Sequence, residues 1–365
     1  MMRGDAWQEL TSVGGLYAAF LRARKGKRYR EDVAAFSLYL EERLFSLQRA
    51  LRRREWRPSP AREFQIYENK PRTITAPAFA DRVVHHALIG AIGGDLEAVM
   101  HPCAFACRPG LGVHQAVACY EQATRRHAYV MKLDVRQYFA SIHLHTLRAQ
   151  IARVVRHPDI LWLVDRILFD DETPVTQALG LPIGSLTSQT FANLYLTDFD
   201  WAIASAEGCE AYLRYMDDIF LFGDDKRTLW NLVDASRQIL STHLRLALHE
   251  GKVHCRQTRE RVDVLGYIVS RRRRWLRNAN GYRFRRRLRA MAAAYARQDV
   301  DLPELRPRVM AWIGHAAHGE TQGLRRSIFR EVTFTRAAAH NEPCDPRRVV
   351  EQQTRVPALG EPQQE

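Results

Sequence analysis

Hydrophobic side chains recur at helical spacing along residues 5–57, and basic side chains fill the other faces. This pattern predicts helices that each bury one face. The apolar positions that carry the pattern include Leu38, Leu44, Leu47 and Leu51. Pro58 and Pro60 are expected to end the helical stretch, because proline lacks the amide hydrogen that a helix requires.

Strand patterns alternate with these helical ones. Residues 64–67 and 72–75 alternate in polarity around a turn of Glu, Asn, Lys and Pro, which predicts a hairpin. Tyr129–Asp134 is an apolar run that ends in an acid and predicts a buried strand. Residues 211–222 predict a strand, a tight turn and a second strand, and residues 262–270 predict a further strand region.

Periodic apolar positions predict helices in the remaining segments. The predicted helices cover residues 80–92, 144–168 with a break near Pro158, 188–202, 228–246, and 284–339 with a break marked by Pro303 and Pro307. Gly180–Gly184 is predicted to form a loop. The tail after Asn341 is rich in Pro, Gln and Glu and is expected to be disordered.

The net charge of the chain indicates what kind of partner it binds. The 365 residues include 55 Lys and Arg against 41 Asp and Glu, which gives a net charge of +14. Ten arginines and no acid lie between Arg271 and Arg289, and a second basic cluster extends from Arg22 to Arg30. Clustered cations of this kind favour a nucleic-acid partner over a merely soluble basic surface.

Composition also excludes several classes of protein. No run of 18 apolar residues predicts a membrane span, and the N-terminus lacks the apolar core of a signal peptide, so a cytoplasmic protein is expected. The six cysteines are expected to be free thiols. The alternative is a zinc site formed by His101, Cys103, Cys107 and His114. Their spacing matches no common zinc pattern.

Three acids interrupt apolar strands. Asp134 follows Val130–Leu133, and Asp217 and Asp218 lie within the apolar run Tyr215–Phe222. Burial of a carboxylate costs several kcal/mol unless a cation or hydrogen-bond donors compensate it. Magnesium prefers oxygen ligands, and two such ions can activate an attacking oxygen and stabilise a leaving one. An ordinary Asp-rich turn is the alternative for the adjacent pair taken alone.

Five segments in order resemble the conserved boxes of reverse transcriptases. Tyr215-Met-Asp-Asp218 resembles the box that carries the paired acids, and Lys132–Ile142 resembles the first catalytic strand. Gly180–Asn193 resembles the loop and helix beneath the new base pair, and Val264–Tyr267 resembles the primer grip. Arg72–Arg82 resembles the fingers of the bacterial, group II intron-like branch.

The resemblance covers about residues 60–340 and implies an α+β, right-hand polymerase fold. Such a fold has fingers, a palm made of an antiparallel sheet with packed helices, and a helical thumb. The implied divisions are an N-terminal helical extension at 1–62, fingers at 63–130, a palm at 131–270 with some finger elements interleaved, a thumb at 271–340, and a tail at 341–365.

The resemblance also implies a catalytic site with two Mg²⁺ ions. The implied catalytic acids are Asp134, Asp217 and Asp218, and Val135 joins them in the metal site. Phe139 would be the steric gate that excludes a ribose 2′-hydroxyl; the alternative is a core aromatic. Lys252 resembles a palm lysine placed near the leaving pyrophosphate.

Further residues are implied to contact substrate and nucleic acid. The substrate contacts would be Lys70, Arg72, Arg82, Ile183, Gly184 and Gln189. The nucleic-acid contacts would be Tyr215, Met216, Leu265, Gly266, Tyr267, Arg285, Arg286 and Arg287. Arginine contacts phosphates, and interleaved aromatic side chains stack on bases or sugars. A solvated basic hairpin at Lys70 and a merely basic segment at Arg285–Arg287 are the alternatives.

Two departures from the general pattern resemble the enzymes of diversity-generating retroelements. Ile183-Gly184 and Ser188-Gln189 stand where most reverse transcriptases have Gln-Gly and Ser-Pro. Ala311–His318 also resembles that group. Because isoleucine cannot hydrogen-bond a nucleotide, Ile183 predicts lowered fidelity. In the group this appears as errors at template adenines, and members work with a structured template RNA and a small basic accessory protein.

These features together predict an RNA-directed DNA polymerase whose partners are template RNA, a DNA primer, the cDNA product and dNTPs. A defence-associated or group II intron-like reverse transcriptase is the alternative enzyme. A non-catalytic RNA-binding scaffold is the alternative from another class, and the three retained acids argue against it.

Overall fold

The computed structural model describes residues 6–67, 71–169 and 178–336. Lys70 and the tail after Asn341 lie outside the described residues. The chain divides into two compact units, Met1–Arg273 and Arg274–Glu365. No helix in the described ranges is both long and apolar enough to cross a membrane.

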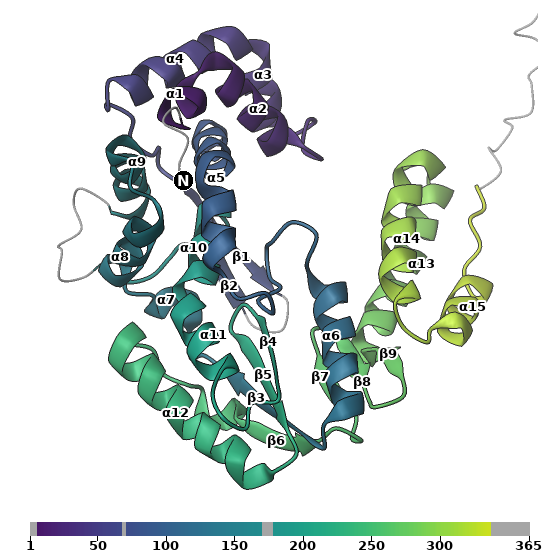
Figure 1. Ribbon diagram of the computed structural model, residues 1–365. Coiled ribbons are helices and arrows are strands. Elements are labelled where there is room, and N and C mark those ends of the chain that lie inside the picture. The colour runs from purple at the N-terminus through teal and green to yellow at the C-terminus, as the bar shows by residue number, and fades with distance from the viewer. Residues whose placement is uncertain (1–5, 68–70, 170–177, 337–365) are drawn as a thin grey trace, which may run out of the picture. The chain divides into compact units, whose positions relative to one another are not determined.

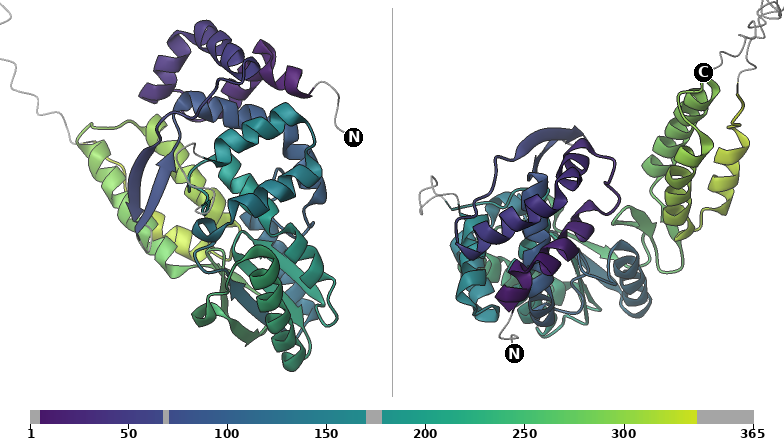
Figure 2. Two further views of the ribbon diagram at one scale, coloured as in Figure 1. Left: turned by 90° about the vertical axis from the view of Figure 1, so that its left-hand side faces the viewer. Right: turned by 90° about the horizontal axis from the view of Figure 1, so that it is seen from above.

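The first unit begins with four helices that pack on a long fifth helix, α5 (Figures 1 and 2). These helices are α1 (Ala6–Thr11), α2 (Val13–Arg24), α3 (Glu31–Leu38), α4 (Leu40–Arg52) and α5 (Phe79–Val99). The rings of Phe20, Phe36 and Phe79 contact one another across α2, α3 and α5. The predicted apolar face of α4 is buried, whereas Leu38 is exposed at the end of α3.

The predicted fingers hairpin is present between α4 and α5. Strands β1 (Arg62–Tyr67) and β2 (Pro71–Ala76) pair antiparallel, with Phe64 opposite Ile74. Most side chains of β1 and the first half of β2 are exposed, so this hairpin contributes little to the core.

The centre of the first unit is an antiparallel sheet in the order β4-β5-β3-β6 (Figure 1). Its strands are β3 (Tyr129–Asp134), β4 (Ala211–Tyr215), β5 (Asp218–Gly223) and β6 (His254–Gln257). Alternate residues of a strand face opposite sides. Helix α12 (Lys226–Leu244) packs on β5 and β3, and Tyr120 of α6 (Val113–Arg126) contacts the rings of Phe220 and Phe222 on the other face.

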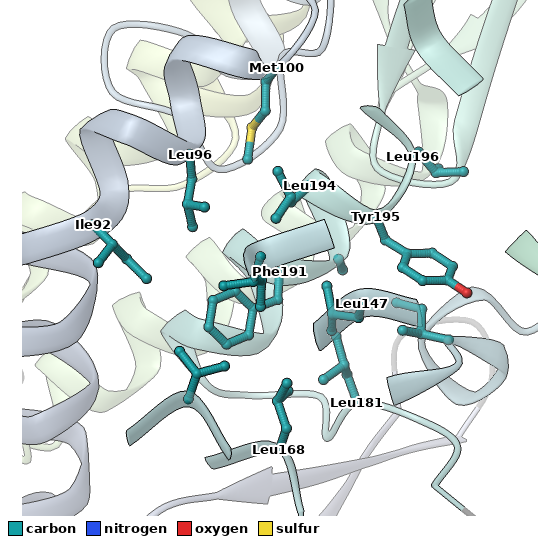
Figure 3. Close-up of a cluster of buried hydrophobic side chains, with 14 of the residues drawn as sticks. Ile92, Leu96, Met100, Leu147, Leu168, Leu181, Phe191, Leu194, Tyr195 and Leu196 are labelled. Carbon is teal, nitrogen blue, oxygen red and sulfur yellow. The ribbon is translucent and has the colours of Figure 1, made fainter. Parts of the chain in front are cut away.

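Helices between β3 and β4 complete the core. They are α7 (Tyr138–Ser141), α8 (Leu144–Val154), α9 (Pro158–Leu168), α10 (Leu186–Tyr195) and α11 (Thr197–Ala204). Figure 3 shows Phe191 and Leu194 of α10 among apolar side chains of α5 and α8, with Leu181 from the preceding loop. All ten labelled side chains are at most 7 % exposed. The loop before α10 and the helix itself are therefore anchored in the hydrophobic core.

The first unit ends with the short helix η2 (Glu250–Lys252) and a hairpin of β7 (Val262–Val264) and β8 (Tyr267–Val269). The second unit contains β9 (Arg274–Leu276), α13 (Asn278–Ala296), α14 (Leu302–Ala317) and α15 (Gln322–Arg330). Its small core has Phe284 stacked on Trp312, with ring centroids 3.8 Å apart, beside buried Ile328.

Several predicted boundaries were wrong. The segment 188–202 contains two helices separated at Leu196, and α13 begins before residue 284. Pro307 lies inside α14 and does not break it, whereas Pro303 occupies the first turn, where proline is tolerated. The sequence pattern also failed to indicate α6 and the edge strand β6.

Candidate active site

The paired acids lie at the tip of the β4–β5 hairpin. Tyr215 pairs with Asp218, so only Met216 and Asp217 form the turn. Met216 has a φ of +57°, the left-handed conformation that a two-residue hairpin turn requires. The Asp217 carbonyl accepts a hydrogen bond from the Val135 amide at 3.3 Å. The turn is therefore tied directly to the strand that carries the third acid.

Asp134 ends β3 directly opposite Asp218 of β5. Opposite residues of an antiparallel pair have Cα atoms about 4.5–5.5 Å apart. The structure thus brings Asp134 close to Asp217 and Asp218, which follow it by 83 and 84 positions in the sequence. Asp134 and Asp218 face the same side of the sheet, and Asp217 lies on the turn beside them.

Two lysines contact these carboxylates. Lys132 Nζ lies 2.7 Å from Asp218 Oδ1, and its ammonium also lies 5.4 Å from the centre of the Phe220 ring. Lys252 Nζ of η2 donates to Asp134 Oδ2 at 2.7 Å. Lys252 therefore lies beside the acids, whereas the contact of Lys132 with Asp218 was not predicted.

Asp217 is in a different environment from the other two acids. Burial raises the pKa of its carboxyl to about 6, and the nearby Asp218 and Asp134 carboxylates act in the same direction. No ion pair involves Asp217 in the described part of the chain. A partly buried carboxyl beside two other acids is the kind of group that a bound cation stabilises.

The donor set fits magnesium, because carboxylate and backbone carbonyl oxygens are the ligands that this hard cation prefers. Within the described ranges, no three Asp, Glu, His or Cys side chains yet surround a common point where an ion could bind. Asp134 and Asp218 are instead bonded to Lys252 and Lys132. The three carboxylates are adjacent, but two of them are engaged by ammonium groups.

A buried ion pair that was not predicted from the sequence supports the β4–β5 hairpin. Arg214 and Asp200 are both fully buried, and Arg214 Nε and Nη2 each donate to Asp200 at 2.6 Å. Arg214 Nη1 also donates to the Met216 carbonyl at 3.2 Å and to Asn193 Oδ1 at 2.9 Å. Tyr212 donates to Asp200 at 2.6 Å. An arginine inside the apolar strand Ala211–Tyr215 was the signal available in the sequence.

The predicted nucleotide loop is held by its backbone. The Thr75 amide of β2 donates to the Ile183 carbonyl, and the Leu181 amide donates to the Phe139 carbonyl of α7, both at 2.8 Å. Gly184 has a φ of +132°, and a Cβ there would lie 2.8 Å from the Thr75 carbonyl oxygen. Glycine is therefore required at this position, and the Ile183 side chain remains 37 % exposed.

Phe139 and the fingers residues occupy distinct environments. Phe139 is half-buried and packs edge-on against Tyr138. Arg72 is exposed on β2, and Gln189 is exposed on α10. Arg82 instead forms an ion pair with Asp32 of α3 and lies over the Phe79 ring, so its guanidinium is engaged by the N-terminal helices.

The β7–β8 hairpin has Leu265 and Gly266 at its turn, both with positive φ. Tyr267, in contrast, is fully buried, so its ring supports the hairpin from inside and is not exposed for the predicted nucleic-acid contact. Tyr215 and Met216 are half-buried beside the acids.

The arginines of the second unit are not equivalent. Arg285 forms an ion pair with Glu331 at 3.3 Å, which makes it a structural contact of α13. Arg286 and Arg287 are exposed on the same helix. These two are the members of the predicted trio that remain accessible.

Comparisons with known proteins agree with this geometry. The sequence profile described as reverse transcriptase (RNA-dependent DNA polymerase) matches residues 61–269. Protein YkfC of Escherichia coli (strain K12) is 25 % identical over 201 residues, which are 52 % of this chain and 49 % of that protein. The chain therefore spans about half the length of this curated relative.

Solved structures of apo telomerase from Candida Tropicalis are similar over 57 % of this chain, with a TM-score of 0.44 and 12 % identity. The aligned part is 53 % of the form truncated from the C-terminal domain and 47 % of the other form. The α+β architecture with its antiparallel palm sheet is the right-hand polymerase fold. Because the profile covers more than half of its residues, this chain belongs to the reverse transcriptase family.

Proposed function

We propose that this chain is an RNA-directed DNA polymerase that copies an RNA template into cDNA by extending a primer with dNTPs. The observation that carries the proposal is the pairing of Asp134 with Asp218 beside the turn residue Asp217. Membership of the reverse transcriptase family supports it. A scaffold that only binds RNA would have no need to crowd three carboxylates at a hairpin tip.

In the proposed reaction the primer 3′-hydroxyl loses its proton and attacks the α-phosphorus of a dNTP. A new phosphodiester bond forms, and the bond to pyrophosphate breaks. Magnesium ions held by Asp134, Asp217, Asp218 and the Val135 carbonyl would supply positive charge to the attacking and leaving oxygens. Lys252 is near enough to the acids to offset charge on the pyrophosphate, and exposed Arg72 is the fingers cation for the triphosphate.

Primer extension tests the proposal. The purified chain is given an RNA template, an annealed DNA primer, dNTPs and Mg²⁺. We expect extension that EDTA abolishes and added Mg²⁺ restores. Absence of extension on both RNA and DNA templates, under conditions in which a control polymerase is active, would favour the RNA-binding scaffold.

The Phe139 gate has its own test. Phe139→Ala removes the ring that would clash with a 2′-hydroxyl, so preference for dNTPs over ribonucleotides should fall roughly 10–100-fold in kcat/KM. Phe45→Ala removes an exposed ring on α4 and is the control. Unchanged sugar selection in the Phe139 variant would assign this residue to core packing.

The narrower proposal is that the chain belongs to a diversity-generating retroelement and makes errors at template adenines. Ile183 and Gln189 support it, because they replace the residues found in most of the family and both are exposed at the loop and α10. The predicted partners are a structured template RNA and a small basic accessory protein. The second candidate is a defence-associated or group II intron-like enzyme, which would not direct its errors to adenines.

Ile183→Gln should lower the misincorporation frequency by roughly 2–10-fold, because a new hydrogen bond of about 0.5–1.5 kcal/mol would penalise a misaligned nucleotide. Sequencing the cDNA made in vitro measures this effect. Ile183→Leu keeps the position apolar and should leave the error spectrum unchanged. Errors spread evenly over the four template bases in the wild type would contradict the adenine-directed proposal.

A further inference from the structure

The contact between Lys132 and Asp218 is set by the register of the sheet. Lys132 lies two residues before Asp134 on β3, so both side chains face the same side. The residue opposite Lys132 on β5 is Phe220. Asp218 lies two residues before Phe220, so its side chain is the next one on the same side of the sheet. The Lys132 ammonium bonds Asp218 at 2.7 Å, and the Lys252 ammonium bonds Asp134 at 2.7 Å.

The Lys132 ammonium is held beside Asp218, and there is also space next to it into which it can move. Its side chain is 27 % exposed, and its ammonium lies over the Phe220 ring. It lines a cavity of about 350 Å³ on this face of the sheet, together with Phe220, His254 and Arg256. The ammonium can therefore move away from Asp218 while its aliphatic stem stays against the sheet.

The oxygens bound by the lysines belong to the same carboxylates that a divalent cation requires. Three carboxylates at one hairpin tip repel one another, and ammonium groups on two of them reduce that repulsion. A metal ion and the lysines therefore compete for Asp134 and Asp218.

We propose that Lys132 is a built-in counter-ion of the catalytic carboxylates, which stabilises the metal-free site and must be displaced from Asp218 when a divalent cation binds. This inference rests on the proposed function. Lys132 is thus a positioning residue that lowers the affinity of the substrate-free protein for metal.

Mn²⁺ binding to the full chain without nucleic acid tests the inference, measured by calorimetry or by the paramagnetic resonance of free Mn²⁺. Lys132→Gln should bind Mn²⁺ about fivefold more tightly than the wild type, because no ammonium has to be displaced. In EDTA the same variant should melt about 2–4 °C lower, because the carboxylates lose a counter-charge. A purely structural lysine would lower the melting temperature without tightening metal binding.

Two lysine variants serve as controls. Lys132→Arg keeps the positive charge and should bind Mn²⁺ within about twofold of the wild type. Lys226→Gln removes an exposed lysine at the start of α12, beyond the opposite end of β5, and should change neither quantity. In an Asp218→Asn background, where Lys132 has lost its partner, Lys132→Gln should give no fivefold gain over Asp218→Asn alone.

The outcomes distinguish the counter-ion role of Lys132 from the proposed polymerase activity. If the wild type binds Mn²⁺ and Lys132→Gln binds it equally or more weakly, the counter-ion role is overturned and the proposed polymerase stands. If the wild type binds no Mn²⁺ and extends no primer, both are overturned.

Discussion

Asp217→Asn should reduce the rate of primer extension by roughly 10³-fold or more, which corresponds to about 4 kcal/mol of lost transition-state stabilisation. The amide keeps the size of the carboxyl but carries no charge to hold a divalent cation. Initial rates at saturating dNTP and Mg²⁺ measure the effect. Asp234→Asn, on the exposed surface of α12, is the control and should retain full activity.

The same substitution should stabilise the metal-free protein. The pKa of Asp217 is raised to about 6 in the folded chain, so between pH 3.8 and 6 the folded state holds a proton that the unfolded state has lost. Stability from this group is therefore present at low pH and lost as pH rises through about 6. In EDTA at pH 7, Asp217→Asn should unfold at higher urea than the wild type. An active variant, or one that is less stable in EDTA, would contradict the assigned role.

Asp200→Asn should lower the free energy of unfolding by about 3–5 kcal/mol, because it leaves the buried guanidinium of Arg214 without its counter-charge. Urea unfolding followed by circular dichroism measures the change. Asp198→Asn, on the same helix, removes an exposed ion pair with Arg153 and should cost about 0–1 kcal/mol.

A double variant distinguishes loss of the pair from an uncompensated charge. Asp200→Leu with Arg214→Met replaces the buried ion pair by apolar side chains and should recover much of the stability lost by Asp200→Asn. It should nevertheless lower the polymerase rate, because replacing Arg214 removes its hydrogen bond to the Met216 carbonyl at the hairpin tip. A loss below about 1 kcal/mol in the single variant would show that Arg214 is compensated elsewhere.

The sequence predicted the elements with strong local patterns. The fingers hairpin, the strand Tyr129–Asp134 and the two strands that flank Met216-Asp217 were all confirmed by the structure. Their signals are alternation, apolar runs and turn residues, which depend on neighbours in sequence. The juxtaposition of Asp134 with the hairpin followed from the resemblance, and the sheet register then gave its detail.

What the sequence did not predict depends on long-range pairing. The edge strand β6 has little apolar character and exists because β3 supplies a partner. The pairing of Arg214 with Asp200, and of Lys132 with Asp218, follows from helix packing and strand register, which no local pattern encodes. The burial of Tyr267 likewise depends on elements far away in the chain.

The main-chain attachment of the loop at Ile183 has a consequence for variation. Its carbonyl is fixed by Thr75, the neighbouring Gly184 makes the close approach, and neither contact involves the isoleucine side chain. If Ile183 has the proposed role in fidelity, substitutions at position 183 would alter copying accuracy while the backbone of the loop stays in place. Evolution could then change the error rate through one residue without loss of folding stability.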